Sequence, residues 1–251
     1  MASLPKAFLD RPIAHRGYHD PAAGRIENSR AAVQAAVDAG YGIEIDLQLS
    51  SDGHAMVFHD DVLDRLTSET GPIVQRTAAD LGSIKLRGAD ETIPSFKDIL
   101  ALVSGKAPLL VEIKDQDGAM GPSVGALERA AIEALTRYDG PVALMSFNPH
   151  SVAALADLAP ELPRGLTTCD YEPVFWPMLT EERRTELRQI PDFERTGSAF
   201  ISHQASDLAA PRVQELKAQG VPVLCWTIRS SSSEAEARQV ADNITFEGYP
   251  A

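Results

Sequence analysis

Eight short runs of strand-forming residues, separated by amphipathic helical segments, constrain the fold of this chain more than any other feature. Such units in succession predict a closed (β/α)8 barrel, the TIM barrel. A doubly wound open sheet is the main alternative, but no G-x-G-x-x-G turn follows the first strand, which weakens its dinucleotide-binding version. The expected strands cover residues 11–15, 41–48, 108–114, 141–147, 163–168, 198–203, 222–228 and 243–247.

The helical segments between the strands have recognisable ends. Gly40 and Gly220 lie where a helix C-terminus favours glycine, and Pro149 lies where a first turn tolerates proline. We therefore expect helices within residues 27–40, 95–105, 124–138, 149–159 and 207–220.

A long segment separates the second and third strands. Asp52-Gly53 indicates a tight turn, so the second strand is expected to continue into a hairpin. A loop insertion over about residues 60–92 follows. Because it is too short for its own core, we assign the whole chain, 1–251, to a single domain.

Two other segments leave alternatives open. Residues 169–192 mix aromatic residues with prolines, which suits either a lid at the mouth of a site or a packing loop. Little sequence follows the last strand, so we expect no full final helix, and residues 3–10 could cover part of that space.

Composition excludes some functions. The formal net charge is -13, from 36 acidic residues against 23 Lys and Arg, which argues against a nucleic-acid partner. A small anionic substrate held by a metal and a few basic side chains remains compatible with that charge. No secretory signal and no apolar stretch of membrane-spanning length is visible, so we expect a cytoplasmic protein without stable membrane insertion.

Acidic residues interrupt the apolar pattern of two strands. Side chains alternate along a strand, so Ile43 and Ile45 share one face while Glu44 and Asp46 share the other. In a barrel the apolar face packs under the helices, and the acids, with Glu112 of the next strand, point inward. Three gathered carboxylates need a positive charge between them, and oxygen ligands favour Mg²⁺ or Ca²⁺ over zinc.

The alternative for these acids is simple pairing with neighbouring bases such as Arg16 or Lys114. Either base could also contact the phosphate oxygens of a substrate. His15 and His59 end strands beside the acids, and a pair of imidazoles suits general acid and base catalysis near neutral pH.

Later strand ends supply further candidates for the pocket. His203 ends the sixth strand, and Trp226 lies in the seventh. Either could line the pocket, although Trp226 shares its strand face with Leu224 and Ile228 and could equally be a core residue.

Taken together, these motifs resemble the glycerophosphodiester phosphodiesterase family. They run in order along nearly the whole chain: "HRG" (15–17), "EN" (27–28), "EIDLQLSSDGHAMVFHD" (44–60), "EIK" (112–114) and "CWTI" (225–228). The resemblance implies a TIM barrel that hydrolyses glycerophosphodiesters to an alcohol and glycerol 3-phosphate with a divalent cation.

The resemblance also implies roles for individual residues. The acid/base pair would be His15 and His59, and Asn28 would hold the substrate or brace a metal ligand. The metal ligands would be Glu44, Asp46 and Glu112, and the phosphate contacts Arg16 and Lys114. The nucleophile is either water or the glycerol 2-hydroxyl of the substrate, which would form a cyclic phosphate.

Two positions depart from the family pattern. The family often has asparagine in W-T-x-N, where this chain has Arg229, which could favour a further negative charge on the substrate. The family ending I-I-T-D-x-P reads "ITFEGYP" here, and Glu247 could replace its acid.

Two alternatives to the main prediction remain: a lysophospholipase D-type enzyme, with "YEPVFWPML" contacting the acyl chain, and a non-catalytic barrel that binds a phosphorylated metabolite. The sequence does not predict the oligomeric state.

Overall fold

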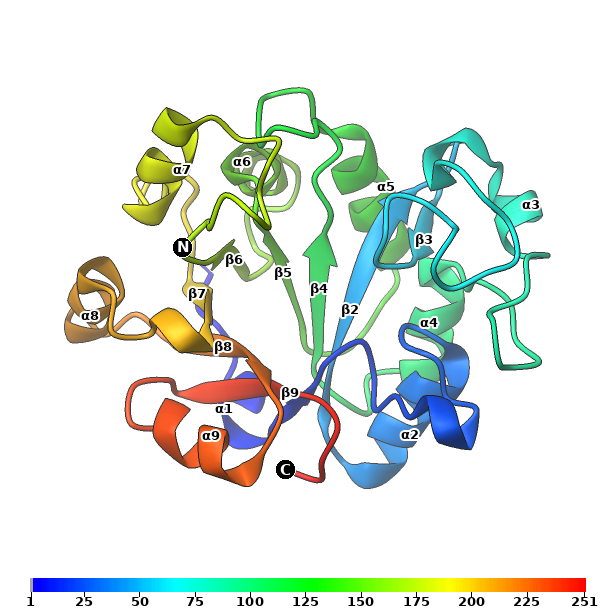
Figure 1. The fold of residues 1–251 in the computed structure, drawn as a ribbon, viewed down its shortest axis with the longest axis horizontal. Helices are drawn as coiled ribbons and strands as arrows, with labels where there is room; N and C mark the ends of the chain where they lie inside the picture. The colour runs from blue at the N-terminus through cyan, green and yellow to red at the C-terminus, as the bar shows by residue number, and fades with distance from the viewer. Residues whose placement is uncertain (1) are drawn as a thin grey trace.

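The sheet closes into a barrel in the computed structural model, which describes residues 2–251 (Figure 1). β1 pairs in parallel with both β2 and β9, which excludes the open sheet and confirms the (β/α)8 prediction. An additional strand, β3 (Ala55–Val57), runs antiparallel to β2 and forms the expected hairpin. The barrel strands, each overlapping a predicted range, are β1 (Ile13–Ala14), β2 (Gly42–Leu49), β4 (Leu109–Ile113), β5 (Val142–Ser146), β6 (Arg164–Thr168), β7 (Phe200–Gln204), β8 (Val223–Ile228) and β9 (Asn243–Phe246).

Helices follow most of the barrel strands. The five predicted helices are present as α2 (Arg30–Ala39), α4 (Phe96–Val103), α5 (Ala126–Leu135), α6 (Pro149–Leu158) and α8 (Pro211–Ala218). Four more were not predicted: α1 (Ala7–Asp10), α3 (Ala78–Leu81), α7 (Glu181–Arg188) and α9 (Ser231–Ala237). α7 and α9 bury only Leu187 and Ala237 respectively, so neither has the apolar stripe that identifies a helix in a sequence. Within residues 2–251, none of the helices combines the length and apolarity needed to cross a membrane.

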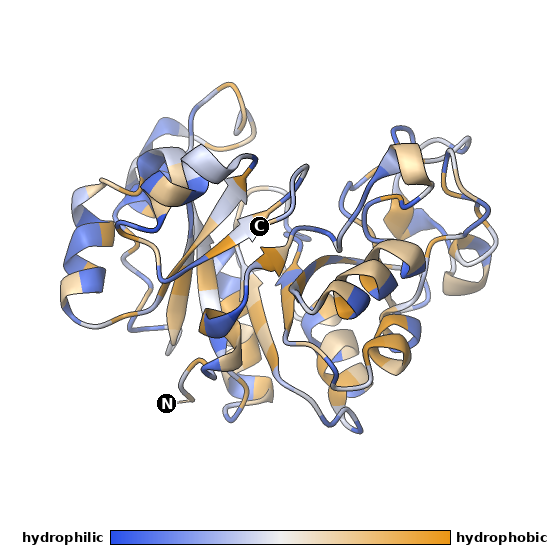
Figure 2. Ribbon diagram, turned by 90° about the horizontal axis from the view of Figure 1, so that it is seen from below, coloured by the Kyte–Doolittle hydropathy of each residue, from blue (hydrophilic) through white to orange (hydrophobic). Residues whose placement is uncertain are grey.

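Apolar side chains fill the barrel below the site. Figure 2 shows hydrophobic residues along the strands and in alternating patches on the helices. Leu110, Phe200 and Leu224, near the N-terminal ends of their strands, form one buried cluster with Phe8 of α1. The backbone carbonyl of Phe8 accepts a hydrogen bond of 2.7 Å from Asn243 Nδ2. Residues 3–10 therefore help close the bottom of the barrel beside β9; that they cover part of the space of a final helix stays a prediction.

Aromatic rings cover the outer side of the last strand. Phe246 packs against Tyr41 and Tyr249, with ring centroids 4.8 and 5.6 Å apart. The Tyr41 hydroxyl donates a hydrogen bond of 3.0 Å to the backbone carbonyl of Ala251. These contacts shield the apolar outer face of β9, which a final helix would otherwise cover.

The insertion after β3 has more internal packing than we expected. Its residues Leu63, Ile73 and Leu86 are buried in a small apolar cluster that is separate from the main core. Met56 of β3 and Phe58, just after β3, belong to the same cluster, as do Ile26, Leu81 and Ile93. The insertion is therefore anchored to the hairpin and shares its apolar cluster with residues outside it; the single-domain assignment stays a prediction.

The contribution of the barrel floor to stability can be measured with Phe8→Ala. Phe8 is fully buried, so its truncation should lower the free energy of unfolding by about 3–5 kcal/mol. Phe175→Ala is the matched control, because this ring is 72% exposed and its loss should change stability by less than about 0.5 kcal/mol. Urea titrations followed by tryptophan fluorescence would compare them, and equal effects would contradict the placement of Phe8.

Candidate active site

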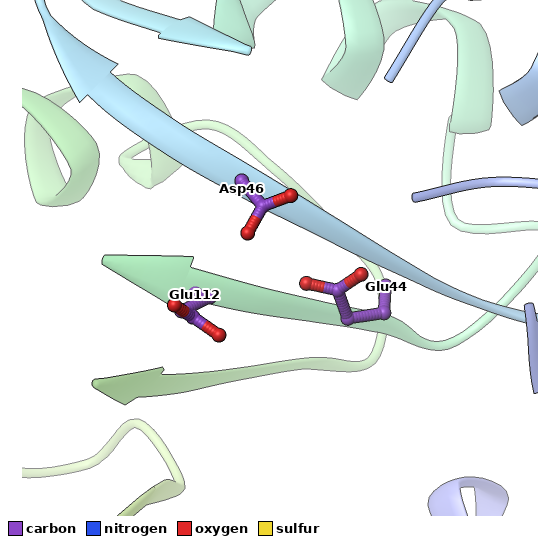
Figure 3. A group of neighbouring side chains, drawn as sticks. All are labelled: Glu44, Asp46 and Glu112. Carbon is purple, nitrogen blue, oxygen red and sulfur yellow. The ribbon is translucent and has the colours of Figure 1, made fainter. Parts of the chain in front are cut away.

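Three buried carboxylates converge inside the barrel toward the C-terminal ends of β2 and β4. Glu44 and Asp46 project from β2 toward Glu112 of β4 (Figure 3), and the parallel register pairs Asp46 with Glu112. One oxygen of each lies within 4.8 Å of the others. The two-residue alternation of the strand thus places both β2 acids on the inner face.

Basic side chains partly balance this charge. Lys114 Nζ lies 2.7 Å from Glu112 Oε1 and 3.1 Å from Asp46 Oδ1, and Arg16 Nε lies 3.5 Å from Asp46 Oδ2. Burial alone would raise the pKa of Asp46, but Lys114, His59 and Arg16 together hold that pKa well below its ordinary value. The predicted alternative, pairing of the acids with these bases, therefore describes part of the site.

Glu44 is not balanced in the same way. Its side chain accepts a hydrogen bond of 2.8 Å from the backbone N–H of Arg16. Burial, followed by repulsion from Asp46 and Glu112, raises the pKa of Glu44 well above its ordinary value. A divalent cation among these three carboxylates would remove the repulsion, and an all-oxygen donor set suits Mg²⁺ or Ca²⁺. The residues therefore fit the predicted metal site.

Asn28 braces Asp46. Its Nδ2 donates a hydrogen bond of 2.8 Å to Asp46 Oδ2, and its Oδ1 accepts one of 3.2 Å from the Asp46 backbone N–H. Asn28 is only 1% exposed and lines neither cavity described below. Of its two predicted roles, the structure therefore supports bracing a ligand, because so buried a side chain has no surface left to contact substrate.

Two histidines line one cavity of about 190 Å³ together with the carboxylates. His15 Nδ1 lies 2.5 Å from Glu247 Oε2, and His59 Nδ1 lies 2.7 Å from Asp60 Oδ1. Within residues 2–251 these carboxylates are the hydrogen-bond partners of the two rings, so each Nε2 remains available. Burial lowers the pKa of His15, although the bond to Glu247 opposes this shift.

Each of these carboxylates also contacts an arginine. Arg65 donates to both oxygens of Asp60, at 2.7 and 2.9 Å, and Arg229 donates to Glu247 Oε1 at 2.9 Å. Asp60 and Arg65 were missing from our sequence prediction. Arg65 lies in the insertion, where no strand or helix period indicates the direction of a side chain.

A larger cavity of about 1240 Å³ adjoins the smaller one, with His59, Lys114 and Trp226 common to both. Trp226 is therefore pocket-lining, as one of the two interpretations held. Residues of the 169–192 segment, including Trp176, Phe175 and Met178, line the larger cavity, which supports a place at the mouth of the site.

His203 does not belong to either cavity. It is 2% exposed, and its ring nitrogens contact Thr168 Oγ1 at 2.8 Å and Asp207 Oδ2 at 3.2 Å. Our expectation that His203 could line the pocket was wrong, because its side chain points to the outside of the strand, under the surrounding loops.

Comparisons with known proteins agree with this architecture. The family model described as "Glycerophosphoryl diester phosphodiesterase family" matches residues 15–243. A glycerophosphodiester phosphodiesterase of Caldanaerobacter subterraneus is 33% identical over 243 residues, which cover 92% of this chain and 91% of the relative. The predicted resemblance is therefore confirmed.

Solved structures also share the fold. A phosphodiesterase of Oleispira antarctica in complex with the product sn-glycerol-3-phosphate superimposes with a TM-score of 0.78 and 27% identity, covering 97% and 96% of the two chains. A glycerophosphodiester phosphodiesterase of Parabacteroides distasonis has a TM-score of 0.75 and 21% identity, covering 94% and 92%. The second match supports the fold alone.

Glu44→Gln tests the carboxylate cluster. The substitution removes a repulsive charge, so the metal-free variant should melt no lower than wild type, while affinity for Mg²⁺ or Ca²⁺ falls at least about 10-fold. Thermal unfolding with chelator and with each cation measures both effects, and Glu161→Gln, at an exposed position outside both cavities, is the control. An unchanged cation-induced shift in Glu44→Gln would count against metal binding here.

Proposed function

The chain belongs to the glycerophosphoryl diester phosphodiesterase family, whose members are phosphoric diester hydrolases, and on this premise we propose that it hydrolyses glycerophosphodiesters to an alcohol and glycerol 3-phosphate. One observation carries the proposal: a single cavity is lined by three carboxylates, two imidazoles and two bases. These residues are Glu44, Asp46, Glu112, His15, His59, Arg16 and Lys114. The product bound to the Oleispira antarctica relative supports the glycerol phosphate half of the assignment.

The negative phosphodiester would be bound by charge. Glu44, Asp46 and Glu112 would hold Mg²⁺ or Ca²⁺, which when bound withdraws negative charge from phosphate oxygens. Lys114 would add a second positive charge beside the same oxygens. Arg16 lines the same cavity beside the carboxylates, which supports a phosphate contact for its guanidinium.

The two histidines would transfer the protons. One imidazole accepts a proton from the nucleophile, and the other donates a proton to the leaving alcohol oxygen. With water as nucleophile the diester is hydrolysed in one displacement. With the glycerol 2-hydroxyl a cyclic phosphate forms first, and water then opens it. Both routes use the same two Nε2 atoms. The hydrogen bond of each Nδ1 to a carboxylate supports this assignment, because it leaves Nε2 available.

A lysophospholipase D-type activity is the second candidate, and one observation favours it. Val174, Phe175 and Met178 are 74%, 72% and 55% exposed, and they cluster in one segment of the chain. Phe175 and Met178 line the larger cavity that adjoins the carboxylates. Exposed apolar side chains at the mouth of a site suit an acyl chain. The non-catalytic barrel has no comparable support, because both histidines are present beside the acids.

The remaining expectations concern the setting of the enzyme. A small phosphodiester is the partner that we propose. The absence of a nucleic-acid partner and the cytoplasmic location stay predictions.

A substrate panel tests the function. With chelator no turnover is expected; with Mg²⁺, Ca²⁺ or Mn²⁺ restored, water-soluble glycerophosphodiesters should release glycerol 3-phosphate, measured by a coupled assay. A lysophospholipid in the same panel decides the second candidate. If it is the better substrate, Phe175→Ser and Met178→Ser should raise its KM without changing that of the soluble diesters. No turnover of any diester with any cation would contradict both functions.

Replacement of the histidines tests the proton transfers. His15→Ala and His59→Ala should each lower kcat by about 10² to 10⁴, because each removes one acid or base. Far-ultraviolet circular dichroism and the melting temperature would show that both variants keep the fold. A variant with near-normal kcat would remove that histidine from the mechanism.

A further inference from the structure

The two positions that depart from the family pattern contact each other. Arg229 follows β8 and Glu247 follows β9, 18 residues apart in the sequence. Arg229 Nε and Nη2 lie 2.9 and 2.8 Å from the same oxygen, Glu247 Oε1. The two positions thus form a connected pair in this chain.

The second carboxylate oxygen of Glu247 contacts His15, one member of the candidate acid/base pair. Oε2 lies 2.5 Å from His15 Nδ1 and 3.5 Å from His19 Nε2. The side chains of His15 and Glu247 are only 14% and 19% exposed, whereas that of Arg229 is 66% exposed. The carboxylate is therefore held between a surface guanidinium and a largely buried imidazole.

The same arrangement occurs at the other histidine. His59 Nδ1 contacts Asp60, and Arg65 donates to both oxygens of Asp60. The two histidine–carboxylate–arginine chains use unrelated segments of the sequence. They recur at both imidazoles of one cavity, as expected if each carboxylate orients a histidine for the reaction.

We propose that Arg229 and Glu247 are a coupled positioning pair for His15. Glu247 accepts a hydrogen bond from the His15 Nδ1–H and thereby fixes the tautomer and ring orientation that present Nε2 to the cavity. Arg229 fixes the longer side chain of Glu247, which has one more rotatable bond than aspartate. Arg229 also lines both cavities, so this role is compatible with the predicted contact to an extra negative charge on the substrate. The inference rests on the proposed function for its effect on rate.

A double-mutant cycle tests the coupling. In Glu247→Asp the shorter carboxylate stays with Arg229 and loses His15, so kcat should fall about 10- to 100-fold with little change in KM. Arg229→Asn should lower kcat about 3- to 10-fold. In the double variant the aspartate is free to approach His15, so the loss should be clearly smaller than the product of the single losses. Arg195→Asn, which breaks an ion pair of 2.6 Å with Asp192 outside both cavities, should leave kcat unchanged.

A spectroscopic readout separates positioning from activity. In ¹⁵N-histidine-labelled, metal-free protein near pH 8, where an ordinary imidazole is neutral, His15 should have Nδ1 protonated and Nε2 unprotonated. A His15→Gln variant assigns the signals. Glu247→Gln should shift His15 toward the other tautomer. The double variant Glu247→Asp with Arg229→Asn should show a His15 signal closer to wild type than Glu247→Asp alone.

The proposal would be overturned if the rate losses of Glu247→Asp and Arg229→Asn multiplied in the double variant, or if the His15 signal were unchanged in Glu247→Gln. A wild-type protein without turnover would overturn the proposed hydrolysis instead, and the nitrogen spectra would still decide whether Glu247 positions His15.

Discussion

Repulsion among three carboxylates kept away from water is the constraint to which the rest of the site responds. Glu44, Asp46 and Glu112 are all buried, and their oxygens lie within 4.8 Å of one another. Some neighbours bring positive charge and others hold an acid in place: Lys114 contacts two of the acids, and Asn28 donates to Asp46. Burial makes each interaction stronger than it would be in water, and each unbalanced charge more costly.

The barrel separates this charge from its apolar floor within single strands. In β4, Leu110 belongs to the cluster closed by Phe8, and Glu112, two residues later on the same face, belongs to the carboxylates. The interior therefore changes from apolar to ionic within a few ångströms along the strand. The acids line the cavity that a substrate would enter.

The features that were predictable from the sequence are those with a short period. Strand alternation identified the barrel strands and placed Glu44 and Asp46 inward, because one side of each strand must pack under helices. α7 and α9 were missed because one buried residue each leaves no apolar stripe. Residues that act across the chain were also missed or assigned differently: Arg65 reaches Asp60 and Arg229 reaches Glu247 through loops, where no period indicates side-chain direction.

The two imidazoles are attached to different parts of the sheet. His15 directly follows β1, a member of the closed ring, whereas His59 lies beyond β3, which is outside that ring and pairs with β2. The β2–β3 register sets the position of His59, because Leu47 pairs with Val57 and the backbone N–H of Phe58 donates to the backbone carbonyl of Asp46. A one-residue slip of this hairpin would turn His59 to the opposite side of the strand while leaving the parallel ring intact.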